Sequence, residues 1–422
     1  MSDWVRIPLD ELVDVIDPHP SHRAPDAVVQ GIPFIGIGDI REDGSLIEGK
    51  GRIVSEKIFE EHIQRYQISD RTIGFGRVAT IGKVISFQNP TTKFVVSPTM
   101  AVLEPKPGTN RDFILHALRS EDIQEQIDKL LTGSTRSSLG IELLRKLTIL
   151  HPATAVAQKI SKVLNSVSSQ IDATQALIDK YTAIKQGMMA DLFSRGIDPE
   201  TKALRPTFEE APELYHETPL GMLPKGWNVD TLSKLAEKIT DGDHHTPERS
   251  SEGRYLLSAR NIHDGYLDFS KVDYVPEYEY QRMIKRCFPE AGDIFISCSG
   301  SIGRVCEVPE NFSCALVRSV ALVKLDNNLV QSSYICWWLR TEKMQKAMIN
   351  SALQAAQPNL FQGAIEQLDV VLCAPEEQLL ISERLNVIES MMLLNKSDLK
   401  KLKVQKAGLM QDLLTGKVPV PA

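Results

Sequence analysis

The sequence predicts an α+β protein with two tandem globular domains, each followed by a long helix. Three observations predict this class. The second half of the chain repeats the first at a shift of about 221 residues, and each repeat ends in an apolar pattern with helical period. Upstream of each helical pattern, short segments rich in β-branched residues and bounded by glycines indicate strands. We therefore expect two copies of one mixed domain, each with its own helix.

The repeat appears as short matches that occur in the same order in both halves. "GIPFIGIGDI" at Gly31 matches "GRYLLSARNI" at Gly253, and "IGKV" at Ile81 matches "IGRV" at Ile302. Further along, "KQGMMADL" in the first half matches "KAGLMQDL" in the second. Ordered matches with nearly one shift do not arise by chance. A period this long indicates a duplicated domain and not a solenoid.

Within each copy, strands and short helices precede the long helix. "KFVVSPTMAVLEP" and "CALVRSVALVKLD" are typical of strands, as are "TIGFGRVATIGKVISF" and "DIFISCSGSIGRVCEV" with their internal glycines. Residues 111–131 and 332–350 favour helices. The predicted boundaries are a first globular domain at 1–150, its helix at 151–196, a proline-rich linker at 197–224, a second globular domain at 225–372 and its helix at 373–418.

The end of each copy carries apolar residues in alternating 4-3 spacing, which is typical of a coiled-coil seam. Polar residues interrupt the seam at matching places, Thr174 with Asn395 and Lys185 with Lys406, and such residues usually fix register. Because a lone helix would expose its apolar face, we expect the two helices to pack on each other. The predicted seam positions are Ile160, Leu164, Val167, Ile171 and Ile178 in the first copy, and Ile381, Leu385, Ile388, Met392 and Leu399 in the second.

Composition excludes several classes of protein. No apolar run approaches the roughly 18 residues that span a bilayer, and the N-terminal residues lack the pattern of a signal peptide, so we expect a cytoplasmic protein. The six cysteines form no C-x-x-C pair, which argues against a zinc ribbon and a disulfide framework. The net charge of −7 does not favour nucleic-acid binding, but residues 71–103 carry four basic and no acidic side chains. A local basic surface of this kind is what phosphate contact needs.

The stretch "TDGDHHTPE" at residues 240–248, the histidine loop, concentrates two aspartates and two histidines and suggests a metal site. Its first-copy counterpart, "HPSHRAP", retains one histidine and the proline but neither carboxylate. If both copies do the same work, a polar loop facing an anionic partner is favoured over a metal site, with a solvated turn as the remaining alternative.

Signatures of catalysis are missing or are not duplicated. Pro25-Asp26 with "EGK" at residues 48–50 resembles a nuclease core, and "GSLIEGKG" nearly matches a phosphate-binding loop, yet neither has a second-copy match. The sequence contains no G-x-S-x-G elbow, H-E-x-x-H helix, glycine-rich dinucleotide fingerprint or N-P-P-Y-type motif of an amino-methyltransferase. We therefore predict no catalytic residue, no metal and no cofactor in this chain.

Taken together, this organisation resembles the specificity subunit of type I restriction-modification systems over essentially the whole chain. Four motifs carry the resemblance: "DGDHHTP" in the histidine loop, "GDIFISCSGSIGRV" at 292–305, "PEEQLLISERLNVIE" at 375–389 and "KAGLMQDLLTGKV" at 406–418. The first copy departs from the pattern, because "PATAVAQKISKVLNSV" lacks the acidic pair before its glutamine and "DLFSRGI" replaces "DLLTGKV".

The resemblance implies that each globular domain is a target-recognition domain for one half of a bipartite, asymmetric DNA site. It implies antiparallel helices that set the unread spacer. Partners would be double-stranded DNA, two methyltransferase subunits that bind S-adenosylmethionine and flip the target adenine out of the duplex, and two motor-nuclease subunits that use ATP and Mg. The alternatives are a coiled-coil scaffold that reads no DNA and a self-sufficient restriction or modification enzyme.

Basic or short polar side chains near glycines and strand ends are the expected DNA contacts, because phosphates need donors and base edges need directed hydrogen bonds. Arg304 and Lys83 share one repeat position, which favours a common phosphate role. The predicted contacts are His22, Arg23, Arg77, Thr80, Lys83 and Lys93 in the first copy, and His244, His245, Arg260, Asn261, Ser299, Ser301, Arg304 and Arg318 in the second.

Overall fold

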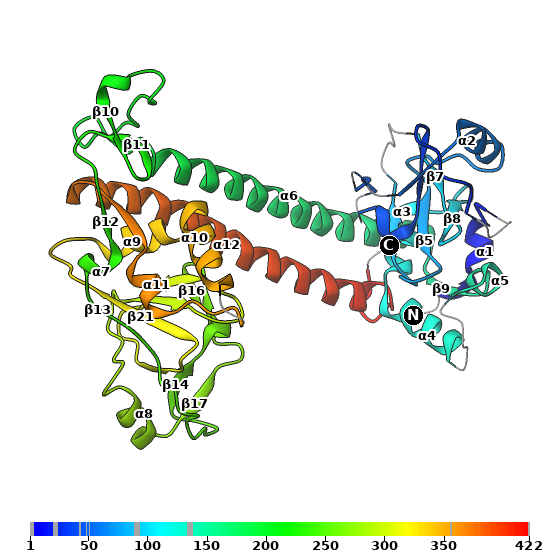
Figure 1. Cartoon of the computed structure of the whole chain (residues 1–422). Coiled ribbons are helices and arrows are strands. Elements are labelled where there is room, and N and C mark those ends of the chain that lie inside the picture. Colours follow the sequence, from blue (N-terminus) through cyan, green and yellow to red (C-terminus); the bar gives the residue numbers. More distant parts are fainter. Residues whose placement is uncertain are drawn as a thin grey trace. The chain divides into compact units, whose positions relative to one another are not determined.

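The computed structural model describes residues 4–19, 24–41, 44–47, 49, 51–87, 93–132, 138–354 and 357–420. The chain folds into two units, and each unit contains one globular domain with parts of both long helices (Figure 1). Unit 1 comprises Met1–Ala176 and Lys396–Ala422, and unit 2 comprises Leu177–Asn395. The end of the second copy's helix therefore belongs to the unit that holds the first copy's domain.

Unit 1 is built on a four-stranded antiparallel sheet in the order β2-β8-β5-β6. Its central strands are almost entirely buried because the apolar runs of β5 and β8 are covered on both faces. A three-stranded sheet has the order β4-β3-β7, and β1 pairs with β9, which joins the beginning and end of the domain. The strands are β1 (Val5–Pro8), β2 (Val13–Ile16), β3 (Ile32–Ile35), β4 (Arg52–Val54), β5 (Ile73–Gly76), β6 (Val84–Ser86), β7 (Val95–Val96), β8 (Met100–Pro105) and β9 (Thr148–His151).

Short helices cover these strands. The side chains of Asn110 and Ser120 accept hydrogen bonds from backbone N–H groups of the first turns that follow them, so the segment predicted as one helix breaks into two. Ile123 and Ile127, one turn apart, pack into the domain core. The helical elements are α1 (Leu9–Leu12), the 3-10 turn η1 (Ile37–Asp39), α2 (Glu56–Ile63), α3 (Arg111–Leu118), α4 (Glu121–Leu131) and α5 (Ile141–Arg145).

Unit 2 repeats this architecture. Its four-stranded sheet has the order β13-β21-β18-β19, its three-stranded sheet the order β17-β14-β20, and β12 pairs with β22. Its further elements are a 3-10 turn, η3, and a β15–β16 hairpin. The elements are β12 (Asn228–Thr231), α7 (Leu232–Leu235), β13 (Ala236–Asp241), β14 (Arg254–Leu257), η3 (Ala259–Asn261), β15 (Ile262–His263), β16 (Tyr266–Leu267), β17 (Asp273–Val275), α8 (Glu277–Met283), β18 (Ile294–Ser297), β19 (Val305–Glu307), β20 (Cys314–Leu316), β21 (Val320–Leu325), α9 (Ser332–Leu339), α10 (Glu342–Leu353), α11 (Gln362–Glu366) and β22 (Asp369–Leu372).

The identical strand order in the two units confirms the predicted duplication and the α+β class. All six cysteines are buried and unpaired, in agreement with the reading of the cysteine spacing. No helix in the described part of the chain combines the length and apolar character that a bilayer crossing requires.

The long helices α6 (Thr154–Leu192) and α12 (Pro375–Leu413) each have 39 residues, which corresponds to about 58 Å. In unit 1, Ile160 near the start of α6 shares a core with Leu413 at the end of α12. In unit 2, Ile381 near the start of α12 shares a core with Leu192 at the end of α6. In both units a helix beginning therefore lies with a helix end, so the two helices run antiparallel.

The predicted seam positions differ in what covers them. Ile160 and Leu164, and their counterparts Ile381 and Leu385, are buried within the cores of the globular domains and not only between helices. Val167, Ile178, Ile388 and Met392 are also buried, whereas Ile171 and Leu399 remain partly exposed. The first turns of each helix thus serve as part of its own domain.

A polar cluster joins the two helices and the globular domain in unit 2. Glu389 of α12 accepts a hydrogen bond from Arg340 at 2.8 Å and lies 3.6 Å from the Lys185 nitrogen of α6. The Arg340 guanidinium stacks 3.9 Å from the ring centroid of Trp337. Only 5% of the Arg340 side chain is exposed, so its charge depends on Glu389 for compensation.

The proline-rich segment 197–224 is part of the packed structure of unit 2. It contains η2 (Pro212–Leu214) and a hairpin of β10 (Tyr215–Thr218) and β11 (Gly221–Pro224). The buried carboxylate of Glu377 accepts hydrogen bonds from the Ile197 backbone at 2.8 Å and from the Trp227 indole at 3.0 Å, and it pairs with Arg205. These contacts tie both ends of the segment to α12.

Each unit also contains an equivalent hydrogen bond between a short helix and a long one, α3 with α6 in unit 1 and α9 with α12 in unit 2. In unit 2 the Trp337 indole donates to Asn386 Oδ1 at 2.8 Å. In unit 1 the equivalent pair is His116 Nε2 and Asn165 Oδ1, 2.7 Å apart. Because Asn165 uses its amino group to donate to Asp112, its oxygen faces the histidine, and His116 is assigned as the neutral tautomer that donates through Nε2. Burial, together with the positive charges of Lys406 and Arg119, lowers the pKa of His116 to about 4.

Replacing Glu389 by alanine should leave the buried Arg340 charge uncompensated and lower the free energy of unfolding by about 3 kcal/mol. Urea unfolding followed by tryptophan fluorescence measures this, because Trp227, Trp337 and Trp338 all lie in unit 2. The matched control is Asp398→Ala, which breaks an exposed pair with Lys401 on the same helix and should cost less than about 1 kcal/mol. Equal effects of the two variants would contradict the role of the cluster.

His116 should also make stability depend on pH. Its pKa is about 4 in the folded chain and about 6.5 in an unfolded one, so the unfolded state binds a proton first as pH falls. Stability is therefore lost progressively between these two values. His116→Gln keeps an amide donor without the titration and should show a smaller drop in urea midpoint between about pH 7 and about pH 5 than the parent chain. Identical drops would exclude this origin.

Candidate nucleic-acid interface

The histidine loop lies against the turn between β20 and β21. The Asp243 backbone N–H donates to the Leu316 carbonyl at 2.8 Å, and the Arg318 N–H donates to the Asp243 carbonyl at 2.9 Å. These bonds hold the turn at residues 317–319 beside the loop that carries His244 and His245. Two segments separated by some 70 residues of sequence thus present their polar side chains together.

Ser319 brings two more loops to the same place. Its hydroxyl oxygen accepts a hydrogen bond from the Ala259 N–H at 3.0 Å, and its carbonyl accepts one from the Cys298 N–H at 2.8 Å. The loops that carry Arg260 and Ser299 therefore meet the β20–β21 turn. We call this the four-loop surface of unit 2, formed by residues 241–246, 258–261, 298–301 and 317–319.

Unit 1 contains the same convergence. The Thr99 hydroxyl lies where Ser319 lies in the repeat, and it accepts a hydrogen bond from the Ile37 N–H at 3.4 Å. The Thr99 carbonyl accepts one from the Arg77 N–H at 2.8 Å. The duplicated fold thus gathers equivalent loops in both units, although their side chains differ.

Ion pairs organise the histidine loop. Asp241 accepts from His244 Nε2 at 2.7 Å and lies 2.6 Å from the Arg286 guanidinium. Asp243 accepts from the His245 backbone N–H at 3.0 Å and lies 2.5 Å from Arg282. In the part of the chain that the structure describes, no group of three or more His, Cys, Asp or Glu side chains is arranged to hold a metal ion. The carboxylates face arginines.

Electrostatics keep Asp243 ionised. Burial alone would raise its pKa, but the His245 N–H and the charge of Arg282 together outweigh that effect and lower the pKa below its ordinary value. Arg282 in turn has a raised pKa, mainly because of its hydrogen bonds to Glu279 and then to Asp243. The loop is therefore held by charged groups at neutral pH.

The predicted contacts of unit 2 divide by exposure. His244, His245, Arg260 and Arg318 are exposed on the four-loop surface, and Ser299, Ser301 and Arg304 are partly exposed. Arg260 pairs with Asp273 at 2.8 Å. Asn261 is only 1% exposed. Its oxygen accepts from the Ser258 N–H at 3.0 Å and its amino group donates to the Asp268 carbonyl at 3.0 Å, so the structure offers no free amide for the predicted base contact.

Arg77 is likewise placed in the interior. It is 7% exposed, donates to the Leu139 carbonyl at 3.1 Å and lies 3.5 Å from Asp17. Its guanidinium ties together strand and loop segments of unit 1 and is not presented for a phosphate contact. A basic residue in an acid-free stretch was the signal for the prediction, but the acidic partner comes from a distant part of the sequence.

Lys83 and Arg304 make similar contacts with backbone carbonyls inside their own domains. Lys83 donates to the carbonyls of Ile37 and Ile40 at 2.9 and 2.8 Å, and Arg304 contacts the carbonyl of Ile262 at 3.5 Å. Ile40 and Ile262 occupy the same repeat position, directly after η1 and η3. The two basic side chains therefore contact the same 3-10 turn, and their common phosphate role stays a prediction.

The other described residues of the first copy that were predicted to contact DNA do not lie together. Thr80 is exposed, and the exposed Lys93 pairs with Glu56 at 3.3 Å and lies 5.5 Å from the ring centroid of Phe59. His22 and Arg23 lie outside the described residues. In unit 1 the structure therefore brings Thr80 to the converging loops through the turn that follows β5, and Lys93 to α2.

Sequence reasoning missed the arginines behind the histidine loop. Arg282 and Arg286 come from α8 and the turn after it, some forty residues from the loop that they contact. Glu279 lies three residues before Arg282, which places this pair on one face of α8, and this is the signal that the sequence does contain. That pattern does not reveal the partner.

A family model decides the identity of the fold. The model of the type I restriction modification DNA specificity domain matches residues 1–182 and 224–404. The chain belongs to this family. It is thus a DNA-recognition subunit that acts with the other subunits of a type I restriction-modification system, and it is not itself the enzyme.

Similar specificity subunits match most or nearly all of the chain. The putative type I restriction enzyme MjaX specificity subunit of Methanocaldococcus jannaschii is 23% identical over 99% of this chain and 94% of its own length. The MjaVIII specificity subunit of the same organism is 22% identical over 78% of this chain and 75% of its own. The crystal structure of the S subunit from M. genitalium matches with a TM-score of 0.63 at 16% identity, over 100% of this chain and 97% of its own.

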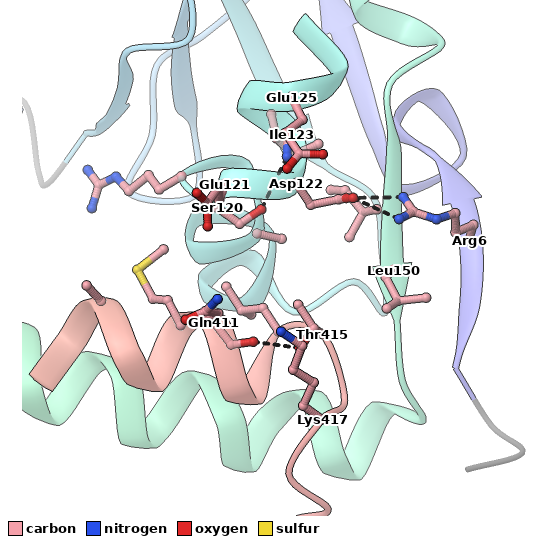
Figure 2. A pocket seen from close by; sticks show the side chains of 16 residues that line it. Arg6, Ser120, Glu121, Asp122, Ile123, Glu125, Leu150, Gln411, Thr415 and Lys417 are labelled. Atoms are coloured by element: carbon pink, nitrogen blue, oxygen red, sulfur yellow. Dashed lines mark hydrogen bonds and ion pairs between the residues drawn. The ribbon is translucent and has the colours of Figure 1, made fainter. Parts of the chain in front are cut away.

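Each unit of this specificity-domain protein also contains an open pocket where the end of a long helix meets the globular domain of the other copy. Figure 2 shows the pocket of unit 1, with a volume of about 590 Å³, in which side chains of α4 and β9 face the last turns of α12. Arg6 and Asp122 form an ion pair at 2.8 Å in its lining. The equivalent pocket of unit 2 has about 680 Å³ and is lined by the matching positions Thr341, Glu342, Met189 and Ser194.

Arg318 is the most direct test of the four-loop surface as a DNA contact. Arg318→Ala should weaken DNA binding by about tenfold and reduce the slope of log affinity against log salt by about 1, since one phosphate neutralisation is lost. Fluorescence anisotropy across a salt series, with the chain assembled with its methyltransferase, measures both quantities. Arg77→Ala should leave the salt slope unchanged because its guanidinium is internal. An unchanged slope for Arg318→Ala would remove this residue from the interface.

Proposed function

We propose that this chain is the non-catalytic specificity subunit of a type I restriction-modification complex, in which each globular domain reads one half of a bipartite, asymmetric DNA site. One observation carries the proposal. Two units with identical strand order present equivalent converging loops that differ in side chains, with Arg318 opposite Pro98 and Ser301 opposite Thr80. A shared scaffold with different loops supports two readers with different half-sites.

The antiparallel helices support a role as a ruler between the two half-sites. Two helices of 39 residues each would set the separation of the half-sites, and the polar cluster at Glu389 supports one register. The bases between the half-sites remain unread.

Partners follow from the same repeat. Two equivalent pockets and two equivalent helix–domain junctions support the docking of two methyltransferase subunits, one on each side. Val387, Leu394 and Val404 of α12 are exposed apolar side chains, which supports coverage of that helix by a partner. The methyltransferases would bind S-adenosylmethionine and flip the target adenine, and two motor-nuclease subunits would use ATP and Mg for restriction in the cytoplasm.

The test is the pattern of methyl-adenine in cells with and without this chain, read by single-molecule sequencing. We expect methylation confined to one split, asymmetric motif that is lost on deletion. Exchange of residues 1–150 for those of another specificity subunit should change only one half of the motif. An unchanged pattern in cells with a demonstrably active methyltransferase would contradict the proposal and favour a scaffold that reads no DNA.

A further inference from the structure

We propose that Asp241 and Asp243, clamped by Arg286 and Arg282, are positioning residues that fix the histidine loop for reading the second half-site. This inference rests on the proposed function and deepens it. His244 and His245 would touch the DNA, and the two carboxylates would act through them. The partner of the loop is double-stranded DNA, which is a polyanion, although the clamp that holds the loop contains two carboxylates.

The first arm of the clamp holds His244. Asp241 Oδ2 accepts from His244 Nε2 at 2.7 Å, while Asp241 Oδ1 lies 2.6 Å from the Arg286 guanidinium. One carboxylate thus fixes the histidine ring from one side and is itself fixed from the other. With Nε2 engaged, the Nδ1 edge of His244 is the edge left for a partner. The His244 side chain is 51% exposed, so it can reach one.

The second arm holds the backbone of His245. Asp243 Oδ1 accepts from the His245 N–H at 3.0 Å, and Asp243 Oδ2 lies 2.5 Å from Arg282. Arg282 donates to both oxygens of Glu279 at 2.9 Å, which gives the bidentate geometry that restricts a guanidinium most. The side chains of Asp243 and Glu279 are each only 11% exposed. This arm is therefore an internal brace.

The arrangement of charge suits an anionic partner. The side chains of Asp241 and Asp243 are 26% and 11% exposed, whereas those of Arg282 and Arg286 are 43% and 55% exposed. The cationic side chains of the clamp are therefore more accessible than the carboxylates that they neutralise. A loop with two aspartates can therefore approach phosphates, because the accessible charges around it are those of Arg282 and Arg286.

Unit 1 uses a different anchor at the same place. The positions equivalent to Arg282 and Arg286 are Glu61 and Arg65, and His19 replaces Asp241. There the His19 ring packs 5.1 Å from the ring of His62 on α2. The first copy has His19 and Ser21 in its sequence where the clamp has its two aspartates, so loss of the clamp should affect the second half-site and leave the first intact.

The decisive variants are Asp241→Asn and Asp243→Asn. If these carboxylates only repelled phosphates, removing a negative charge would strengthen DNA binding. The clamp predicts the opposite sign, a loss of about tenfold in affinity for the intact site and weaker discrimination against base changes in the second half-site, because the ionic contact with Arg286 or Arg282 that orders the loop is gone. Glu277→Gln is the matched control, since it removes an exposed carboxylate of α8 that pairs with Arg254 away from the loop.

The arginines provide the complementary test. Arg282→Ala and Arg286→Ala should reproduce the loss of second-half discrimination. Lys285→Ala removes the same charge from the residue beside Arg286, which has no ion pair among the described residues, and should reduce affinity without reducing discrimination. Binding is measured with the chain assembled with its methyltransferase, on duplexes with base changes in either half of the motif.

Each outcome has one meaning. Failure of the unmodified complex to discriminate either half would contradict the proposed function and not the clamp. Normal reading by the unmodified complex with unchanged or stronger binding by Asp243→Asn would overturn the clamp. Equal losses in both halves would also overturn it, because they indicate general unfolding, whereas retained reading of the first half shows that the variant is folded.

Discussion

The structure depends on the apolar stripe of each 39-residue helix, which cannot remain in water. The stripe is covered by two kinds of neighbour, the domain that precedes the helix and the other long helix. Because the helices run antiparallel, the end of each reaches the domain of the other copy, as Leu413 with Ile160 and Leu192 with Ile381 show. Gly196 and Gly416 follow the two helix ends in left-handed backbone conformations against Trp227 and Trp4, where a Cβ atom would collide with the indole ring. One packing requirement thus joins each globular domain to both long helices.

Polar contacts then select one arrangement among the many that apolar packing would accept. Glu389 receives Arg340 from the globular domain and Lys185 from α6, so its carboxylate is compensated only when both elements are in register. Asn165 and Asn386 do the same with His116 and Trp337. The two asparagines lie at repeat-related positions, and so do their partners, although one partner is a histidine and the other a tryptophan. The duplication therefore preserved the geometry of the contacts more closely than their chemistry.

Patterns with a local cause could be predicted from the sequence. The repeat, the seam and the alternation of strands with short helices depend on spacing alone, and the structure agrees in each case. Contacts between distant segments could not be predicted. The helix expected at 111–131 divides where Ser120 caps α4, and the proline-rich segment is anchored by Glu377, which lies far along the chain. Arg77 and Asn261 are residue types that often contact DNA, but here they bond to carbonyl, carboxylate and amide groups inside the fold. The contacts of Arg282 and Arg286 could not be predicted because nothing near them in the sequence indicates the histidine loop as their partner.

The division of the chain has a consequence for folding during synthesis. Unit 1 is completed by Lys396–Ala422, whereas its first segment ends at Ala176, so the whole of unit 2 must leave the ribosome before the first domain obtains its last helix turns. At roughly 5–20 residues per second, the first half of α6 waits on the order of 10–45 seconds for Leu413 and Leu414, which share its core. Until then, the core of unit 1 lacks the side chains that the end of α12 contributes. The domain that begins the chain is therefore the last to have its core completed during synthesis.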